Sequence, residues 1–470
     1  MSNSLIRSIS GVRGVTGESL TPNMVSNHVV GFTRLLESKY GQTQKTLVLG
    51  RDSRVSGPWV EMIAIGSLVA IGYKVIHIDI ASTPTVQFMV QTRKASGGIV
   101  ITSSHNPIEW NGLKFIGPDG LFIDPENCTA LFELADQQSQ NDNARLFSTY
   151  NKLGSVEKVS NANDLHIDAI FKLDFIKVEE IKKHQYKVCL DSVNGAGGPI
   201  MESLLKRLGC QVFGMNLEPT GIFAHTPEPV PQNLGDLCQF VKKQQANFGI
   251  AVDPDVDRCV VIDENGVPLG EEYTLAMAVE LLLGDCKRKG TVCKNLSSSR
   301  AIDDIAQKYG CTVISTPVGE IQVAKKMQLH NAVIGGEGNG GVMLPDIHIG
   351  RDAPVAAALI LQLLSNRGGG SISKLKQTLP QYEIVKLKAA IEGLDPDSIL
   401  AEIKSEYIQK PDLYKLNEDD GLKIDAKDYW VHLRKSNTEH IIRVIAESKT
   451  QEEATKVANE FIKIIESKRK

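Results

Sequence analysis

Three segments of the chain place reactive polar side chains directly after a run of apolar residues. They are residues 96–107 (SGGIVITSSHNP) with Ser104, residues 246–258 (ANFGIAVDPDVDR) with Asp253, Asp255 and Asp257, and residues 331–341 (NAVIGGEGNGG) with Glu337 and Asn339. The first offers a hydroxyl nucleophile. The second offers carboxylates for a hard cation, and the third offers a glycine-rich loop with hydrogen-bonding side chains.

Ser104 stands at the end of an apolar strand, where its hydroxyl is exposed and backbone donors are close, as a nucleophile requires. Taken alone, the segment favours a simple hydroxyl-rich turn closed by Asn106 and Pro107, and only the presence of the other two loops reverses that weighting. His105 follows directly, and neighbouring side chains of an extended backbone point to opposite sides. The pattern therefore does not predict His105 as a base for Ser104. No G-x-S-x-G surrounds the serine, which argues against a hydrolase elbow.

Asp253, Asp255 and Asp257 alternate along the chain and converge only if the backbone curls around a cation. Their oxygen ligands favour Mg²⁺ or Ca²⁺, and without a cation the three carboxylates repel one another. The segment resembles an EF-hand loop, with Glu264 at the twelfth position, but Arg258 occupies the position of the required glycine. Because the flanking segments are strands, the sequence predicts a Mg²⁺ site, with a solvated acidic turn as the alternative.

The glycine-rich segment 336–341 matches G-x-G-x-x-G, yet VMLPD follows it, and Pro345 argues against the helix that a dinucleotide site requires. The pattern instead predicts a flexible loop in which Glu337 and Asn339 bind vicinal hydroxyls. A fourth segment joins two strands near the C-terminus. Its candidate phosphate ligands are Arg434, Ser436, Asn437 and Thr438, with Arg443 downstream. A plain surface hairpin is the alternative for this segment.

The elements that carry these loops follow a repeated plan of apolar strand, polar turn and helix, which predicts parallel sheets covered on both faces. Ligands of such sheets bind beyond the carboxyl ends of the strands, where the loops lie. The apolar run at residues 353–364 is too short to span a bilayer and predicts a core helix. After residues 366–373, a plausible linker, strand and helix patterns alternate differently and predict an α+β domain with helices at residues 395–407 and 450–470.

Composition indicates an ordinary globular protein of several domains. The chain has 470 residues, is 42% hydrophobic and 23% charged, and has a formal net charge of −4. No basic stripe indicates nucleic-acid binding, and no apolar leader or membrane span is evident. Eight scattered cysteines without a C-x-x-C pair fit reduced thiols. We therefore expect a cytoplasmic protein without nucleic-acid or membrane partners.

The motifs TSSHNP, DPDVDR, GEGNGG and RKSNTE, in this order, resemble those of the α-D-phosphohexomutase superfamily, and the resemblance covers essentially the whole chain. It implies three related mixed α/β domains and a C-terminal α+β domain, similar to the TATA-binding protein, around a central cleft. The domains are expected at residues 1–155, 156–265, 266–373 and 374–470, and they carry in turn the phosphoserine, metal, sugar and phosphate loops. The oligomeric state is expected to be monomer or homodimer.

The resemblance also implies a mechanism. Ser104 matches the phosphoserine that exchanges its phosphoryl group with a phosphorylated hexose through a hexose 1,6-bisphosphate. Asp253, Asp255 and Asp257 match the Mg²⁺ ligands, and an oxygen of phosphorylated Ser104 completes the shell. The sugar-hydroxyl loop is matched by Glu337 and Asn339. The remaining matches are listed by role: Arg13, His105 and Lys114 as catalytic residues, Arg258 beside the metal, and Arg434, Ser436, Asn437, Thr438 and Arg443 as the grip on the non-reacting phosphate.

The opening SGVRG and the segment VGE at residues 318–320 resemble most the phosphoglucosamine mutase branch of the superfamily. Departures from the common pattern are Ser103, Lys435 and His440, and Asn339 stands where many members have serine. A phosphomannomutase or phosphoglucomutase is the alternative, because Asn339 lies in the loop that helps to set sugar preference. A non-catalytic phosphosugar-binding protein and a Mg²⁺-dependent phosphatase are two further hypotheses, distinguished by turnover and by phosphate release.

Overall fold

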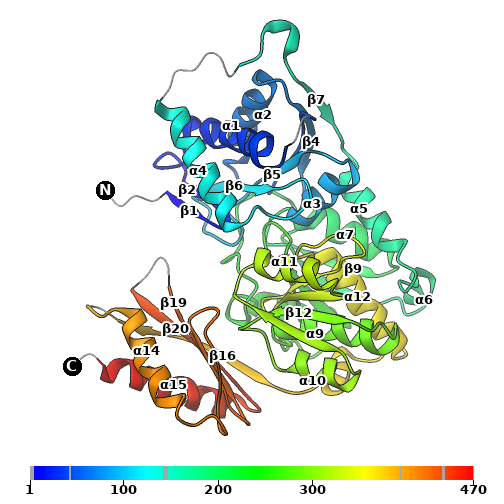
Figure 1. The fold of residues 1–470 in the computed structure, drawn as a ribbon. Coiled ribbons are helices and arrows are strands. Elements are labelled where there is room, and N and C mark those ends of the chain that lie inside the picture. The colour runs from blue at the N-terminus through cyan, green and yellow to red at the C-terminus, as the bar shows by residue number, and fades with distance from the viewer. Residues whose placement is uncertain (1–4, 42–43, 141–146, 392, 437–439, 469–470) are drawn as a thin grey trace. The chain divides into compact units, whose positions relative to one another are not determined.

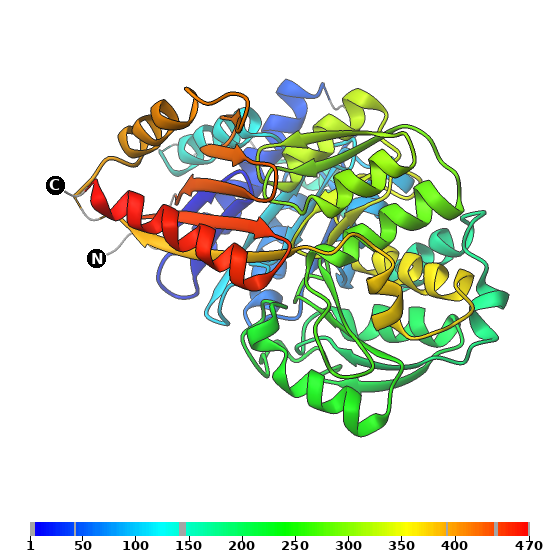
Figure 2. The ribbon, with the colours of Figure 1, turned by 90° about the horizontal axis from the view of Figure 1, so that it is seen from below.

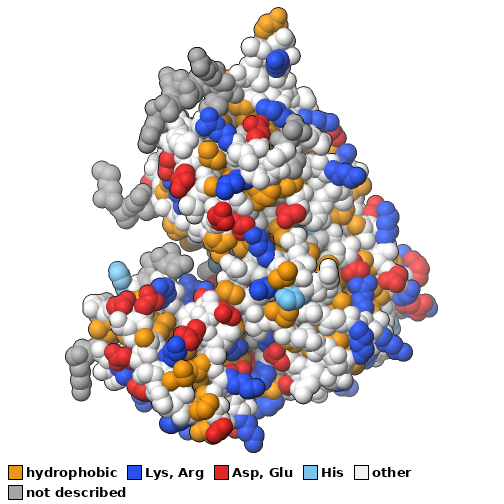
Figure 3. Space-filling model, in the orientation of Figure 1, with side chains coloured by type: hydrophobic (Ala, Val, Ile, Leu, Met, Phe, Trp, Pro, Cys, Tyr) orange, Lys and Arg blue, Asp and Glu red, His pale blue; other side chains and the backbone are white. Residues whose placement is uncertain are grey.

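A computed structural model describes residues 5–41, 44–140, 147–391, 393–436 and 440–468. The chain forms two compact units, Met1–Leu281 with Gly340–Lys376, and Leu282–Asn339 with Gln377–Lys470. Figure 1 shows the course of the chain. On the face drawn in Figure 3, acidic and basic side chains are interspersed. Among the described residues, no helix has both the length and the apolar character needed to cross a bilayer.

The first unit opens with a mixed seven-stranded sheet. Its strands, in the order β1-β2-β6-β5-β3-β4-β7, are β1 (Ile6–Ser8), β2 (Gly11–Val15), β6 (Trp110–Ile116), β5 (Gly97–Ile101), β3 (Thr46–Arg51), β4 (Lys74–Ile80) and β7 (Ser155–Lys158). β3 runs parallel to β4 and β5, whereas β6 returns antiparallel to β5. The serine loop is therefore the turn between β5 and β6. The sequence predicted parallel pairing, and this antiparallel return departs from that prediction.

Helices cover both faces of this sheet, as the strand pattern predicted (Figure 1). They are α1 (Pro22–Lys39), α2 (Gly57–Ala70) and α4 (Pro125–Gln140) on one face and α3 (Thr83–Thr92) on the other. Because strand side chains alternate, Leu47 and Leu49 of β3 enter the core beneath α1 and α2, and Val48 enters the core beneath α3. These two apolar layers fix β3 and β5 in the middle of the sheet.

A second sheet of the first unit carries the carboxylate loop. Its strands, in the order β11-β10-β8-β9, are β11 (Cys259–Ile262), β10 (Phe248–Val252), β8 (Lys187–Asp191) and β9 (Gln211–Met215). Its helices are α5 (Ala162–Phe171), α6 (Val178–Lys182), α7 (Gly197–Arg207) and α8 (Gly235–Gln244). β10 is parallel to β8 but antiparallel to β11, so the carboxylate loop is also an antiparallel turn.

The remaining elements of this unit include a buried helix. They are α9 (Glu272–Glu280), β15 (Gly341–Met343), α12 (Ala353–Asn366) and most of α13 (Ile372–Gln377). α12 is buried from Ala353 to Leu364, which confirms the predicted core helix. The carboxylate of Asp352 accepts a hydrogen bond from Val355 N (2.9 Å) and so caps the helix N-terminus.

The second unit contains two sheets. The first is built from the parallel strands β13 (Thr312–Thr316), β12 (Thr291–Asn295) and β14 (Ile334–Glu337), with helices α10 (Ala301–Lys308) and α11 (Glu320–His330). The second is fully antiparallel, in the order β16 (Glu383–Ala390), β20 (Ile441–Ser448), β19 (Trp430–Lys435), β18 (Leu422–Asp425) and β17 (Lys415–Asn417). The predicted α+β region is thereby confirmed.

Two helices cover one face of this antiparallel sheet, α14 (Pro396–Tyr407) and α15 (Gln451–Ser467), and Figure 2 shows α15 lying over its strands. Asp395 caps α14 as the sequence predicted. The opposite face carries several polar side chains. Its side chains His432 and Lys423 bind the turn that follows β12, through Ser297 Oγ (2.9 Å) and Leu296 O (2.7 Å).

Candidate active site

The serine loop holds Ser104 in a left-handed backbone conformation. Its φ is +49°, its side chain is buried, and its N–H donates to Thr102 Oγ1 (2.9 Å). Because the backbone is not extended here, the side chains of Ser104 and His105 meet, with Oγ and Nδ1 3.2 Å apart. The sequence argument that these two side chains diverge is therefore wrong, since it assumed a continuing strand.

The buried side chain of Arg54 supports the serine loop through hydrogen bonds. Its guanidinium is fully buried and donates to four backbone carbonyls, those of Ser104 (2.6 Å), Asn106 (2.7 Å), Pro107 (2.7 Å) and Trp110 (2.8 Å). Arginine has five N–H donors, and the fifth, on Nε, binds Asp52. Four of its five donors therefore hold the loop directly. Arg54 was not predicted, because residues 50–54 (GRDSR), at the end of β3, carry no recognisable site pattern.

Asp52 completes this brace. Its Oδ2 accepts from Arg54 Nε (3.1 Å) and from Thr102 Oγ1 (2.7 Å), so one carboxylate supports both the arginine and the start of the loop. Burial raises the pKa of Asp52, and the charge of Arg54 and the Thr102 hydroxyl offset part of that rise. The ring of Phe223 lies over the guanidinium of Arg54, and its centroid is 4.9 Å from Arg54 Cζ.

The three aspartates converge because their loop curls. Val256 has φ +63°, and Asp253 Oδ1 accepts from the backbone N–H groups of Asp257 and Arg258, each at 3.1 Å. The three carboxylates are completely buried, and one ligand atom from each lies within 4.8 Å of the others. Asp253 Oδ2 is also 3.3 Å from Ser104 Oγ. The serine and the carboxylates therefore form a single site.

Cations surround the carboxylates. Lys114 Nζ lies 2.6 Å from Asp255 Oδ2 and 3.6 Å from Asp257 Oδ2, and Arg351 Nη2 lies 2.5 Å from Asp257 Oδ2. Thr83 Oγ1 donates to Asp255 Oδ2 (2.7 Å). Burial alone would lower the pKa of Lys114, but Asp255 and Asp257 outweigh it and raise that pKa, so the ammonium stays charged.

The carboxylates fit a divalent cation. Oδ1 of Asp255 and Oδ1 of Asp257 are buried and have no hydrogen-bond partner among the described residues. Burial, together with repulsion from Asp257 and Asp255, raises the pKa of Asp253 well above its ordinary value. Burial also opposes ionisation of Asp255, yet the charge of Lys114 and hydrogen bonds from Lys114 and Thr83 lower its pKa. Hard carboxylate oxygens in this arrangement are suited to Mg²⁺.

Arg351 was not predicted, because it lies 94 residues from Asp257 in the sequence. The N-terminus of α12 positions it. Asp352, the next residue, caps this helix, and its Oδ2 lies 2.8 Å from Nε2 of both His166 and His348. All three side chains of this cluster are buried. The start of α12 is therefore fixed directly beside the carboxylate loop.

The other predicted residues of the first unit lie at the same site. Arg13, in β2, donates from Nη1 to Asn106 Oδ1 (2.9 Å), and burial lowers its pKa. Burial, followed by the charges of Arg258 and Arg13, lowers the pKa of His105 well below its ordinary value. Arg258 reaches Glu228 Oε1 (3.4 Å), which is 3.9 Å from His105 Nε2.

The remaining predicted residues belong to the second unit. Glu337 ends β14 and is buried, and its Oε1 accepts from Asn295 Nδ2 (2.8 Å) and Gly319 N (3.0 Å). Asn339 Nδ2 lies 3.5 Å from the other oxygen, Glu337 Oε2. The two side chains predicted to bind sugar hydroxyls are therefore neighbours. Asn295 carries no signal in the sequence, and its hydrogen bond to Glu337 joins the adjacent strands β12 and β14.

The predicted phosphate loop follows β19. Arg434 on β19 stands directly opposite Arg443 on β20, and Ser436 N donates to Ile441 O (3.1 Å) as the hairpin closes. Asn437 and Thr438 lie outside the described residues. Arg434 Nε donates to Asp420 Oδ2 (2.7 Å), a contact that the sequence did not suggest.

Comparison with known proteins identifies the family. Four domain models described as phosphoglucomutase/phosphomannomutase match in order, alpha/beta/alpha domain I at residues 5–142, domain II at 164–266, domain III at 270–382 and the C-terminal domain at 386–464. A phosphoglucomutase/phosphomannomutase of Thermococcus kodakarensis is 36% identical over 97% of both chains. A probable phosphoglucosamine mutase of Methanopyrus kandleri is 32% identical over 97% of this chain and 96% of that protein.

Solved structures have the same fold. A putative phosphomannomutase from Thermus thermophilus superposes with a TM-score of 0.82 at 24% identity, covering 99% of this chain and all of that one (100%). A phosphoglucomutase/phosphomannomutase family protein from Burkholderia thailandensis gives a TM-score of 0.82 at 23% identity, covering 98% of each chain. The chain therefore belongs to the phosphoglucomutase/phosphomannomutase family and is a phosphohexomutase, an intramolecular phosphotransferase of four domains.

Proposed function

We propose that this phosphohexomutase interconverts glucosamine 6-phosphate and glucosamine 1-phosphate through a phosphoserine at Ser104 and an enzyme-bound 1,6-bisphosphate. The observation that carries the proposal is the 3.3 Å separation of Ser104 Oγ and Asp253 Oδ2. It places a nucleophilic hydroxyl at the edge of a buried cluster of three carboxylates. A phosphoryl group on Ser104 would share that cluster with the cation the carboxylates are suited to hold.

The transfer itself depends on alignment and charge more than on covalent assistance by the protein. The bond between the phosphorus and Ser104 Oγ breaks as a sugar hydroxyl oxygen bonds to the phosphorus. Asp253, Asp255, Asp257 and phosphorylated Ser104 would hold Mg²⁺, which would supply charge neutralisation. A phosphoserine dianion and three carboxylates exceed the charge of one such ion. Four cations compensate for that excess: Lys114, Arg13, Arg258 and Arg351.

Proton transfer falls to groups beside Ser104. His105 Nδ1 lies 3.2 Å from Ser104 Oγ, so its imidazole is placed to take the proton of the attacking sugar hydroxyl and to return it to the serine oxygen as the bond to phosphorus breaks. Lys114 keeps its charge between Asp255 and Asp257 and is better suited to stabilise the transferring phosphoryl group. Arg13, hydrogen-bonded to Asn106 in the serine loop, is placed to bind the same phosphoryl oxygens.

The second unit would hold the sugar. Glu337 and Asn339 would bind hydroxyls of the ring, and Arg434, Ser436, Asn437, Thr438 and Arg443 would bind whichever phosphate is not reacting. Because the same cradle serves either phosphate, the bisphosphate has to reorient between the two transfers. The three domain boundaries predicted from the sequence, at residues 155/156, 265/266 and 373/374, belong to this proposal.

The choice of sugar rests on the resemblance of residues 318–320 and of the N-terminal SGVRG to phosphoglucosamine mutases. Relatives named probable phosphoglucosamine mutase, 30–32% identical, support it. One observation favours the alternative, a phosphoglucomutase or phosphomannomutase activity. The relative with 36% identity carries that name.

Two measurements test the proposal. The first compares kcat/KM of the phosphorylated enzyme, with Mg²⁺ present, for the glucosamine, glucose, mannose and N-acetylglucosamine phosphates. Glucosamine phosphates should be preferred, and a preference for glucose or mannose would leave the mutase activity intact but replace its substrate. The second is Ser104→Ala, which should abolish turnover. Unchanged turnover, stoichiometric release of inorganic phosphate or binding without turnover would each contradict the mutase.

A further inference from the structure

Asp420 lies at the turn between β17 and β18 and binds two separate segments. Its Oδ2 accepts from Arg434 Nε (2.7 Å) and from Val318 N (2.8 Å). Its backbone carbonyl accepts from His432 Nε2 (2.6 Å), which must carry the hydrogen because a carbonyl only accepts. The turn is thereby anchored to β19, and the carboxylate bridges β19 and the turn after β13.

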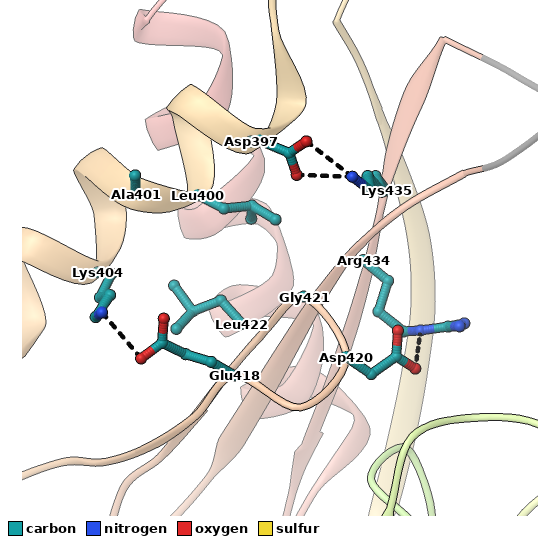
Figure 4. Close-up of a pocket in the computed structure, with 10 residues that line it drawn as sticks. All are labelled: Asp397, Leu400, Ala401, Lys404, Glu418, Asp420, Gly421, Leu422, Arg434 and Lys435. Atoms are coloured by element: carbon teal, nitrogen blue, oxygen red, sulfur yellow. Dashed lines mark hydrogen bonds and ion pairs between the residues drawn. The ribbon is translucent and has the colours of Figure 1, made fainter. Parts of the chain in front are cut away.

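The contact with Asp420 determines which edge of Arg434 is free. A guanidinium binds oxyanions along two edges, one formed by Nε with a terminal nitrogen and one formed by the two terminal nitrogens. Asp420 occupies Nε, and Figure 4 shows the terminal nitrogens of Arg434 extending away from the carboxylate. Those two nitrogens have no partner among the described residues. Arg434 is therefore held with one complete two-donor edge available to a phosphate.

Arg434 also faces a second cation. It stands opposite Arg443 in the register of β19 and β20, so their side chains leave the sheet on the same face. Like charges directly opposite each other on neighbouring strands are unfavourable. Asp420 compensates for the charge of Arg434 by binding its Nε. An anion that binds both arginines would compensate for the charge of Arg443.

A short path leads from Asp420 to the predicted sugar loop. Val318 N binds Asp420, and the next N–H along the chain, that of Gly319, donates to Glu337 Oε1 (3.0 Å). Gly319 has φ +132°, a conformation that favours glycine. Two successive backbone N–H groups thus connect the carboxylate that holds Arg434 with the carboxylate predicted to bind the sugar.

We propose that Asp420 is a positioning residue of this enzyme. It orients Arg434 so that the two terminal nitrogens of the guanidinium bind the non-reacting phosphate. Through residues 318–319 it also fixes the position of that arginine relative to Glu337. The inference rests on the proposed function, because it takes Arg434 as a phosphate ligand. Asp420 itself, as an anion, does not bind the phosphate.

A matched control lines the same pocket of about 410 Å³. Figure 4 shows three carboxylate–cation pairs around it, Asp420–Arg434, Asp397–Lys435 and Glu418–Lys404. Glu418→Gln removes a charge from the pair with Lys404 (2.9 Å) but leaves Arg434 untouched. This control should leave KM and kcat unchanged.

The experiment is a double-mutant cycle on KM for glucosamine 1-phosphate and glucosamine 6-phosphate, using Asp420→Asn, Arg434→Ala and both changes together. If neither is turned over, the hexose phosphate pair with the highest kcat/KM replaces them. Asparagine keeps one acceptor oxygen for Val318 N but loses the charge that holds Arg434. Asp420→Asn should raise KM about tenfold for both phosphates, with kcat changed less than about threefold. In the Arg434→Ala background the same change should have no further effect on KM.

The outcomes separate the two levels of inference. If Arg434→Ala leaves KM unchanged, Arg434 is not a phosphate ligand and that part of the proposed function fails. If Arg434→Ala raises KM but Asp420→Asn does not, only the positioning role is wrong. An equal increase from Asp420→Asn in both backgrounds would also overturn it, since that effect would not pass through Arg434. Thermal midpoints of all variants show that each protein is folded.

Discussion

Replacing Arg54 tests whether the buried brace holds Ser104 in place. In Arg54→Lys, three ammonium donors must replace five guanidinium donors, of which four serve carbonyls of the serine loop. At least two buried acceptors lose their partners, each at a cost of about 1–3 kcal/mol. The loop can avoid that cost by moving, and a displacement of roughly 1 Å in a reacting group lowers turnover about 100-fold.

We therefore expect Arg54→Lys to lower kcat about 100-fold and to change KM less than about threefold, since the substrate phosphate is proposed to bind elsewhere. The assay combines steady-state kinetics with the thermal midpoint and the mass of the intact protein, which reports whether Ser104 is phosphorylated. Arg207→Lys is the control. Arg207 also pairs with an aspartate, Asp168, and lies over an aromatic ring, that of Phe171. A kcat for Arg54→Lys within threefold of the parent enzyme would refute the reasoning.

Two further predictions concern charge. Lys114→Met leaves Asp255 and Asp257 without their nearest ammonium group. Mg²⁺ should therefore raise the thermal midpoint of this variant more than that of the parent enzyme. Equal increases in the two proteins would contradict the role of Lys114 in compensating the carboxylate charge. Burial lowers the pKa of His28 from 6.5 to about 4, against the opposing effect of its hydrogen bond to Met24 O. The pKa of His28 is lower in the folded than in the unfolded protein, so protonation of His28 favours unfolding. The folded protein is therefore at its full stability, as far as His28 is concerned, above pH 6.5 and loses part of it as pH falls toward about 4. Between about pH 7.5 and about pH 5 the loss is about 2 kcal/mol, and His28→Leu should remove that part of the pH dependence, measured as unfolding free energy.

The sequence predicted the elements well where local patterns are strong. The strands before Ser104 and Asp253 are apolar runs ended by turn residues, and both were recognised. The Asp395 cap and the core helix at Ala353–Asn366 also follow from local signals. The pairing direction did not follow, because an antiparallel return such as β5–β6 is decided by the loop backbone and not by the apolar pattern of its strands.

The missed contacts share a physical cause. Ser104 adopts a left-handed conformation without being glycine, and no local pattern predicts this, since the contacts of Arg54 and Thr102 impose it. Arg351 and Asp420 act over long sequence separations, 94 residues to Asp257 and 102 residues to Val318. Such pairs become visible only when the fold brings their backbones together.

The most direct test of the account follows the phosphate on Ser104. The purified enzyme is labelled with a hexose 1,6-bisphosphate carrying ³²P, separated from it, and mixed with unlabelled glucosamine 6-phosphate and Mg²⁺. The account predicts that the label resides in the peptide containing Ser104 and moves to sugar phosphate within one turnover. Label on another residue, or label released as inorganic phosphate without transfer to the sugar, would contradict it.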